Sequence, residues 1–308
     1  MSWLHRHVWA LLAACVALAG GLALGAGPLQ GREEQTTPVG GGSADDLTPP
    51  PDDDPFQEAL TLATRQSLVD ARLQGGFVTL VVLPEVDDRL VDEVTSVIEQ
   101  AGGSLTATVR LDEEFVDPTS KTYVDSVAKS SAKGVEELAA IPSDDTYALI
   151  SGLFTRAYVT GEASPPVVDE VATKIDSELQ GAKLVTVEGD WTRRGSLVVV
   201  LAPDDDDGAL ATAAHLIEVK LIAALSDTAD AVLVATSPAA SSPGGLLGEL
   251  SDAKLTASRV STLNVVNSAA GQVASVFALA AAANGQVGDF GIVNDQVVLP
   301  PGLSIPRG

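Results

Sequence analysis

The chain has 308 residues, which is room for one large domain or two small ones beside a terminal accessory segment. Hydrophobic residues make up 45% of it and aromatic residues only 4%, so we expect a core of Ala, Val and Leu, as in helices packed closely on a sheet. The 42 acidic and 18 basic residues give a formal net charge of −24, a field that repels phosphate backbones and argues against a nucleic-acid partner. The single cysteine, Cys15, excludes an intrachain disulfide.

Residues 8–28 are predicted to form one transmembrane anchor. The stretch carries no charge, and about 20 helical residues rising 1.5 Å each span the hydrocarbon layer of roughly 30 Å. Arg6 precedes it and the chain turns acidic after Arg32, so the positive-inside tendency places residues 1–7 in the cytoplasm and the remainder outside, at the plasma membrane. Small residues recur every fourth position on one face and offer a contact for a homo-oligomer: Ala13, Ala17, Gly21 and Gly25.

Two alternatives stay open for this segment. Gly25-Ala26-Gly27 offers the small residues of a signal-peptidase site, so the segment can also be read as a cleaved secretory signal. Leu12-Ala13-Ala14-Cys15 fits the pattern of a lipoprotein signal, with a lipidated cysteine. The apolar run is longer than a signal core and continues past Cys15, which favours an uncleaved anchor.

A spacer and a short helix are predicted next. Residues 29–55 contain Gly40-Gly41-Gly42, Pro49-Pro50-Pro51 and Asp52-Asp53-Asp54 with little apolar content, a composition typical of a disordered tether. Residues 56–74 contain good helix formers with apolar residues on one side, and the glycines that follow end the helix.

The rest, residues 75–308, is predicted to be an extracytoplasmic α/β domain. Phe77 to Leu83 is a continuous run of β-branched and aliphatic residues that indicates a buried strand. A loop over Pro84 to Asp88 and a helical pattern follow, and Thr106 to Leu111 returns as a strand. The helical pattern consists of Val91, Val94, Val97 and Ile98. Strand, helix and strand make a βαβ unit, for which parallel pairing is expected.

The same order recurs later in the chain. Ser196 to Leu201 and Ala231 to Ala235 are predicted strands, and Ala209 to Leu225 is the helix between them. Helical sequence over residues 120–180 and a strand over Lys183 to Val187 separate the two units. We therefore predict an α/β fold with a mostly parallel sheet and flanking helices, built from two related βαβ-like halves of one sheet.

An acidic loop follows the first strand of each half. In open parallel sheets, ligands bind at loops that leave the carboxyl ends of the strands. The second loop, together with Asp87 and Asp88 of the first, offers hard oxygen ligands for a divalent cation. Its members are Asp204, Asp205, Asp206 and Asp207. The alternative is that these aspartates stabilise helix N-termini, and consecutive aspartates lack the alternate spacing of a calcium loop.

Motifs of the common enzyme classes are absent from the sequence. It contains no dinucleotide-binding glycine fingerprint after a strand, no phosphate-binding P-loop and no nucleophile elbow. The cluster Gly244, Gly245 and Gly248 is explained by a loop before a helix. His215 is the one histidine after the predicted anchor, and we interpret it as a partly buried structural residue or a weak metal-ligand candidate. We predict a protein that is not an enzyme and has no cofactor.

Three stretches resemble the MctB-type copper-transport proteins of mycobacteria and other actinobacteria. They are His5 to Leu29, Gln100 to Pro118 (QAGGSLTATVRLDEEFVDP), which is the most specific, and Val260 to Gly291. The resemblance implies a role in copper export or homeostasis, copper as a transported or sensed ion, and a location that extends toward the outer envelope. The coiled-coil stretch that follows the anchor in the family is replaced here by the Pro/Gly/Asp spacer.

The residues themselves leave other functions open. Copper(I) prefers thiolate, thioether and imidazole, whereas the chain after the anchor has one histidine, no cysteine and no methionine. A non-catalytic scaffold or regulator that binds cell-wall or division proteins is the alternative. A third hypothesis is an enzyme or sugar-binding module that uses Asp204 to Asp207.

Overall fold

The computed structural model describes residues 55–162, 164, 167–189, 191–204, 209–242, 244–256 and 259–303. The predicted anchor at residues 8–28, its small-residue face, Cys15 and the predicted spacer up to residue 54 lie outside these ranges. Among the helices of the described ranges, none combines the length and the apolar character needed to cross a membrane.

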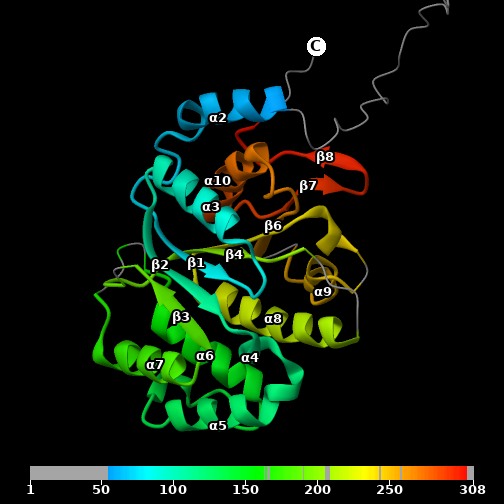
Figure 1. The fold of residues 1–308 in the computed structure, drawn as a ribbon. Coiled ribbons are helices and arrows are strands. Elements are labelled where there is room, and N and C mark those ends of the chain that lie inside the picture. The colour runs from blue at the N-terminus through cyan, green and yellow to red at the C-terminus, as the bar shows by residue number, and fades with distance from the viewer. Residues whose placement is uncertain are drawn as a thin grey trace, which may run out of the picture. The chain divides into compact units, whose positions relative to one another are not determined.

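An eight-stranded sheet organises the described part of the chain (Figure 1), in the order β3-β2-β1-β4-β5-β6-β7-β8. The strands are β1 (Phe77–Val82), β2 (Ser104–Leu111), β3 (Val185–Glu188), β4 (Leu197–Leu201), β5 (Ala231–Ala235), β6 (Val260–Leu263), β7 (Asp289–Val293) and β8 (Gln296–Val298). The six central strands, β2, β1, β4, β5, β6 and β7, are parallel, and β3 and β8 are antiparallel at the two edges. The mostly parallel α/β fold predicted from the sequence is confirmed.

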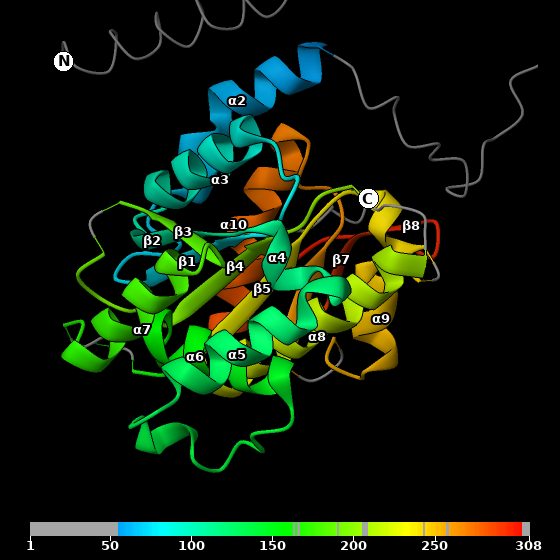
Figure 2. The ribbon, with the colours of Figure 1, turned by 60° about the horizontal axis from the view of Figure 1, so that its bottom comes forward.

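Helices cover both faces of the sheet, as the two views in Figures 1 and 2 show. On one face lie α2 (Pro55–Val69), α3 (Asp88–Gln100) and α10 (Ala269–Ala283). The other face carries α4 (Glu113–Val116), α5 (Lys121–Ser131), α6 (Thr146–Tyr158), α7 (Glu170–Gly181), α8 (Ala209–Thr228) and α9 (Leu246–Asp252). Each face has its own apolar core, and alternate residues of β1 divide between them: Leu80 belongs to one and Val81 to the other.

The first predicted βαβ unit is present. β1 and β2 pair in parallel with Phe77 opposite Ser104, and α3 joins them. All four residues of the predicted apolar stripe, from Val91 to Ile98, are buried. A strand also forms at the position predicted for Lys183 to Val187. It runs antiparallel to β2, because the long helical excursion from α4 to α7 returns the chain to the end of β2 at which it left, with Val185 opposite Leu111.

The second unit lies beside the first in the same sheet. β4 pairs in parallel with β1, and α8 leads on to β5. The chain steps from β1 to β2 in one direction and from β4 to β5 in the other, so α3 and α8 cover opposite faces of the sheet. The loops after β1 and β4 therefore leave the sheet toward opposite faces. This divergence is the topological switch point of an open parallel sheet, where ligands characteristically bind.

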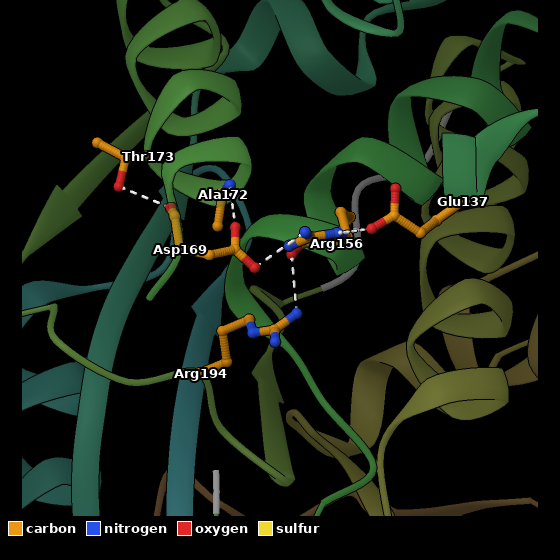
Figure 3. A network of polar contacts seen from close by, with 6 residues as sticks. All are labelled: Glu137, Arg156, Asp169, Ala172, Thr173 and Arg194. Carbon is orange, nitrogen blue, oxygen red and sulfur yellow. Dashed lines mark hydrogen bonds and ion pairs between the residues drawn. The ribbon is translucent and has the colours of Figure 1, made fainter. Parts of the chain in front are cut away.

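A polar network ties the helical excursion together (Figure 3). The Arg156 guanidinium of α6 bonds Glu137 Oε1 at 3.1 Å and Asp169 Oδ2 at 2.9 Å. Asp169 also caps α7, because its Oδ1 accepts a hydrogen bond of 2.8 Å from the Ala172 N–H. Arg194, just before β4, donates to the Arg156 carbonyl at 3.4 Å. These contacts join α6 and α7 to the segment that leads into β4.

Candidate functional site

Two adjoining cavities open at the carboxyl ends of β1 and β4. The α3-side pocket, of about 440 Å³, extends over the ends of β5 and β6, and the α8-side pocket, of about 390 Å³, lies against α8 and the loop around α4. Glu85 and the segment Ala202 to Asp204 line both cavities. Together they form what we call the strand-end crevice, at the place where the sheet topology reverses.

The turn between β1 and α3 shapes the α3-side pocket. Glu85 adopts a left-handed backbone with φ of 67°, a conformation that is uncommon for residues with a side chain and that costs free energy. Two residues later, Asp87 is the N-cap of α3, and its Oδ1 accepts a hydrogen bond of 2.7 Å from the Arg89 N–H. The helix-capping role considered for the acidic loop is therefore confirmed for Asp87.

The cation in this pocket has a carboxylate partner. Arg89 Nε contacts Glu93 Oε1 at 2.7 Å, and Gln272 Nε2 of α10 donates to Glu93 Oε2 at 2.6 Å. The hydrogen bond and the charge of Glu93 raise the pKa of Arg89 above its ordinary value. Glu85, Asp87 and Asp204 add three further carboxylates to the lining, so the pocket is acidic overall.

Ser237 is the buried polar residue of the α3-side pocket. It lies two residues after the end of β5 and is 5% exposed. Its hydroxyl has no hydrogen-bond partner among the described residues. Val86, Ala202 and Val266, which also line the cavity, are buried and apolar. Buried hydroxyls are nearly always bonded in folded proteins, so an unpaired one in the lining of a cavity points to a partner outside the chain.

The α8-side pocket combines apolar and acidic residues with one imidazole. His215 of α8 is half-buried, and its Nδ1 lies 2.9 Å from the Gly244 carbonyl oxygen. Because a carbonyl can only accept, Nδ1 is the donating nitrogen, and the neutral ring then has its lone pair on Nε2. Glu218, one helical turn further along α8, lines the same cavity and is 6% exposed. At the rim, hydrogen bonds from the Thr119 hydroxyl and N–H hold the pKa of Asp117 below its usual range.

The predicted metal-ligand candidates are divided between the two pockets and the outer surface. Asp204 and His215, 11 positions apart in the sequence, line the same cavity. Asp87 lines only the α3-side pocket, whereas Asp88 turns away to pair with Arg110 of β2 at 2.9 Å. Asp205, Asp206 and Asp207 lie outside the described residues. Within the described ranges, no three His, Cys, Asp or Glu side chains are grouped closely enough to hold a metal ion.

Sequence reasoning missed several lining residues. Ser237, Asn267 and Glu218 were not singled out, although each carries a polar group into the crevice lining. For Ser237 a signal existed, because Thr236-Ser237 stands directly after a fully apolar strand, where a ligand-contacting loop is expected. Gly244 and Gly245 form a loop before α9, as predicted, and Gly245 is the N-cap, whereas Gly248 lies within the helix.

Comparison with protein families gives one match that covers nearly the whole chain. A family described as copper transport outer membrane protein, MctB, matches residues 1–301. The chain belongs to the MctB family. This match confirms the resemblance seen in the sequence and, by its description, associates the family with copper transport at the outer membrane. Comparison with curated protein sequences gives no significant match.

Because the MctB family is associated with copper transport, we compared the donor atoms of the chain with the ligands that copper prefers. Copper(I) favours sulfur, and no cysteine or methionine occurs after residue 15. Imidazole and carboxylate suit copper(II), and His215, Asp204 and Glu218 line the α8-side pocket, although the described residues include no group of three such side chains placed to hold one ion. The donors of the described domain thus fit the oxidised ion better than the reduced one.

Proposed function

We propose that this MctB-family protein handles copper in the cell envelope without catalysing a reaction, and that the domain from residue 75 onward meets the ion outside the cytoplasm. The observation that carries the proposal is the family match over residues 1–301, which includes both the apolar N-terminal stretch and the α/β domain. Copper is the cargo or the sensed ion, and no resident cofactor is part of the proposal.

The α8-side pocket is the proposed place of contact with copper(II). His215 Nε2 carries the lone pair, since Nδ1 donates to the Gly244 carbonyl, and this second contact fixes the orientation of the ring. Asp204 and Glu218 line the same cavity, but the described side chains do not group these three residues closely enough to hold one ion together. His215 is therefore the proposed protein donor, since imidazole suits copper(II).

Competition titration tests this part of the proposal. Purified full-length protein is titrated with copper(II), and separately with copper(I), against a chelator of known affinity. We expect saturable binding of one copper(II) per chain, weakened at least about tenfold by His215→Ala, since loss of one ligand costs metal affinity on that order. The matched control is His5→Ala/His7→Ala, which removes the imidazoles ahead of the apolar stretch and leaves binding unchanged. Copper(II) binding that survives His215→Ala contradicts the assignment.

The membrane part of the proposal is a single anchor at residues 8–28, with residues 1–7 in the cytoplasm. It rests on the uncharged run and the flanking charges. Small residues at positions 13, 17, 21 and 25 offer a face for a homo-oligomer. Mass determination of the mature protein separates this anchor from a cleaved signal and from a lipidated Cys15. A reporter that is active only outside the cytoplasm, fused after Gly308, tests the orientation.

The alternative is a non-catalytic scaffold or regulator that binds another envelope protein. Apolar side chains of the α8-side pocket beside its carboxylates, among them the exposed Leu210, favour a protein contact as a second candidate. Cross-linking in intact cells, followed by chelation, distinguishes the two functions. A specific partner that stays bound after copper is removed, together with a negative titration, establishes the scaffold.

A further inference from the structure

The α3-side pocket contains a buried serine that the copper proposal does not use. It adjoins the α8-side pocket and shares Glu85 and Asp204 with it, but Ser237 lines only the α3-side pocket and His215 only the α8-side pocket. Its buried lining is apolar, from Val86, Ala202 and Val266, with the Ser237 hydroxyl among these residues. The exposed carboxylates of Glu85, Asp87 and Asp204 stand around it. This arrangement has an apolar base, one buried hydroxyl and an acidic rim.

The charges of the lining select the class of ligand. Three carboxylates lie beside an Arg89–Glu93 pair that is already neutralised, so an anion such as a phosphate is repelled. A directly bound metal ion is not favoured either, because the described residues include no group of three ligands with suitable spacing. A ligand that donates N–H bonds and carries positive charge matches carboxylates, which only accept.

The buried hydroxyl adds a second requirement. Ser237 Oγ is buried and lacks a partner among the described residues, the rim carboxylates included. A ligand hydroxyl or amide that reaches it relieves an unpaired buried group, which gives selectivity against analogues that lack that group. A cavity of about 440 Å³ is large enough for a small molecule or one side chain of a peptide.

We propose that the α3-side pocket binds a small organic cation, namely an amine. Its ammonium group lies at the acidic rim and its short apolar body covers Val86 and Val266. A second polar group of the ligand forms a hydrogen bond with Ser237. The ammonium group belongs either to a free amine or to a lysine side chain of a peptide. Topology explains the location, because the loops after β1 and β4 diverge here and leave the strand ends accessible.

A set of matched probes tests the proposal on full-length protein in the presence of a strong metal chelator. The probes are 5-amino-1-pentanol, pentylamine, which lacks the hydroxyl, and 1,5-pentanediol, which lacks the charge. Binding is followed by ligand-observed NMR titration. We expect the amino alcohol to bind saturably, about tenfold or more tighter than the diol, because a charge-assisted hydrogen bond contributes at least that factor.

Variants assign the two polar contacts. Asp204→Asn is expected to weaken both amines and leave the diol unaffected. Ser237→Ala is expected to remove the advantage of the amino alcohol over pentylamine. The matched control is Ser151→Ala, since Ser151 is also buried with an unpaired hydroxyl but lies on α6, away from the crevice. Both serine variants should fold with similar stability, so only ligand binding separates them.

Each outcome decides the proposal. It is overturned if no amine binds saturably, if the diol binds as tightly as the amino alcohol, or if Ser151→Ala reproduces the effect of Ser237→Ala. Binding that appears only when the chelator is replaced by Mg²⁺ also overturns it and assigns the pocket to a metal ion. A blocked lysine amide and a trilysine peptide identify the source, since preference for the peptide over the amino alcohol points to a protein partner. Copper binding through His215 is measured separately, so failure of one proposal leaves the other standing.

Discussion

The Tyr158 hydroxyl donates a hydrogen bond of 2.7 Å to Asp176 Oδ1, and neither residue is more than 9% exposed. Gln180 Nε2 lies 2.9 Å from both oxygens of the same carboxylate. The Tyr158 ring packs edge-on against Phe154, with centroids 4.9 Å apart, and in a tilted arrangement against Trp191, with centroids 5.2 Å apart. One side chain therefore joins α6 to α7 and to the segment before β4.

Tyr158→Phe should destabilise the protein by about 1–3 kcal/mol, because it leaves a buried carboxylate with one hydrogen bond fewer. The measurement is the free energy of unfolding in urea. Tyr123→Phe is the control: the Tyr123 hydroxyl donates to the Ala182 carbonyl at 2.7 Å, but the residue is 47% exposed, so water replaces the lost bond. Equal losses in the two variants would contradict the importance of burial.

Alkaline pH should weaken the fold through Tyr158. Burial first, and then the charge of Asp176, raise the pKa of Tyr158 above its ordinary value. A group whose pKa is higher in the folded than in the unfolded state contributes its full stabilisation at pH values below its unfolded pKa, here about 10. This stabilisation is lost as the pH rises beyond that value. Unfolding free energies measured across that range should fall less steeply in Tyr158→Phe. Identical slopes would show that Tyr158 does not govern the loss.

Arg156→Met should cost about 1–2 kcal/mol, since the guanidinium is only 13% exposed and bonds two carboxylates that are themselves partly solvated. Arg156→Lys should not restore the full stability, because an ammonium group lacks the fork that reaches Glu137 and Asp169 together. Lys174→Met is the control: its pair with Glu178, at 3.8 Å, is exposed, and its loss should be near zero. Urea unfolding of the three variants checks the order.

The same network should show an acid dependence. Partial burial favours a higher pKa for Asp169, but the Ala172 N–H and the Arg156 guanidinium outweigh it and hold the pKa below the usual range. A depressed folded-state pKa contributes stability above the unfolded pKa of about 3.9, and this is lost as the pH falls through the folded value. The stability gap between the unsubstituted protein and Arg156→Met should therefore narrow toward about pH 3. A constant gap would argue that packing, not charge, holds Arg156.

Asp87→Ala should destabilise α3 by about 1 kcal/mol, through loss of the N-cap bond to Arg89, whereas Asp87→Ser keeps an acceptor and most of the stability. Thermal unfolding compares the two. Because Asp87→Ser removes a crevice carboxylate without removing the cap, it separates the helix-capping role from any contribution to ligand binding. Equal stability of Asp87→Ala and the unsubstituted protein would exclude the cap.

Gly271→Ala should destabilise the protein by about 1–3 kcal/mol. Gly271 donates its N–H to Ser268 Oγ in the first turn of α10, and an added Cβ would collide with the Val265 carbonyl oxygen. Gly181→Ala is the matched control at the end of α7, where the new methyl group meets open space; its effect should be neutral or stabilising by up to about 1 kcal/mol. Differential scanning calorimetry checks the opposite signs.

The pattern of apolar residues was enough to predict much of the fold. Val91, Val94, Val97 and Ile98 repeat at helical spacing, and the segments on either side are short and rich in β-branched and aliphatic residues, so α3 and its two strands follow from the sequence alone. The antiparallel direction of β3 did not follow, because strand direction depends on where a helical excursion of some 70 residues returns the chain. Strands β6 to β8 were not predicted, since β6 and β8 have only four and three residues.

The sequence by itself determined the family, the acidic charge and the presence of acidic loops after two buried strands. Only the tertiary structure brought Asp204 beside His215, and Ser237 into the same crevice as Glu85. The reason is physical: local periodicity fixes which residues are buried, whereas the crevice depends on the lateral order of the strands. That order is set by packing between segments more than 100 residues apart, which no local pattern records.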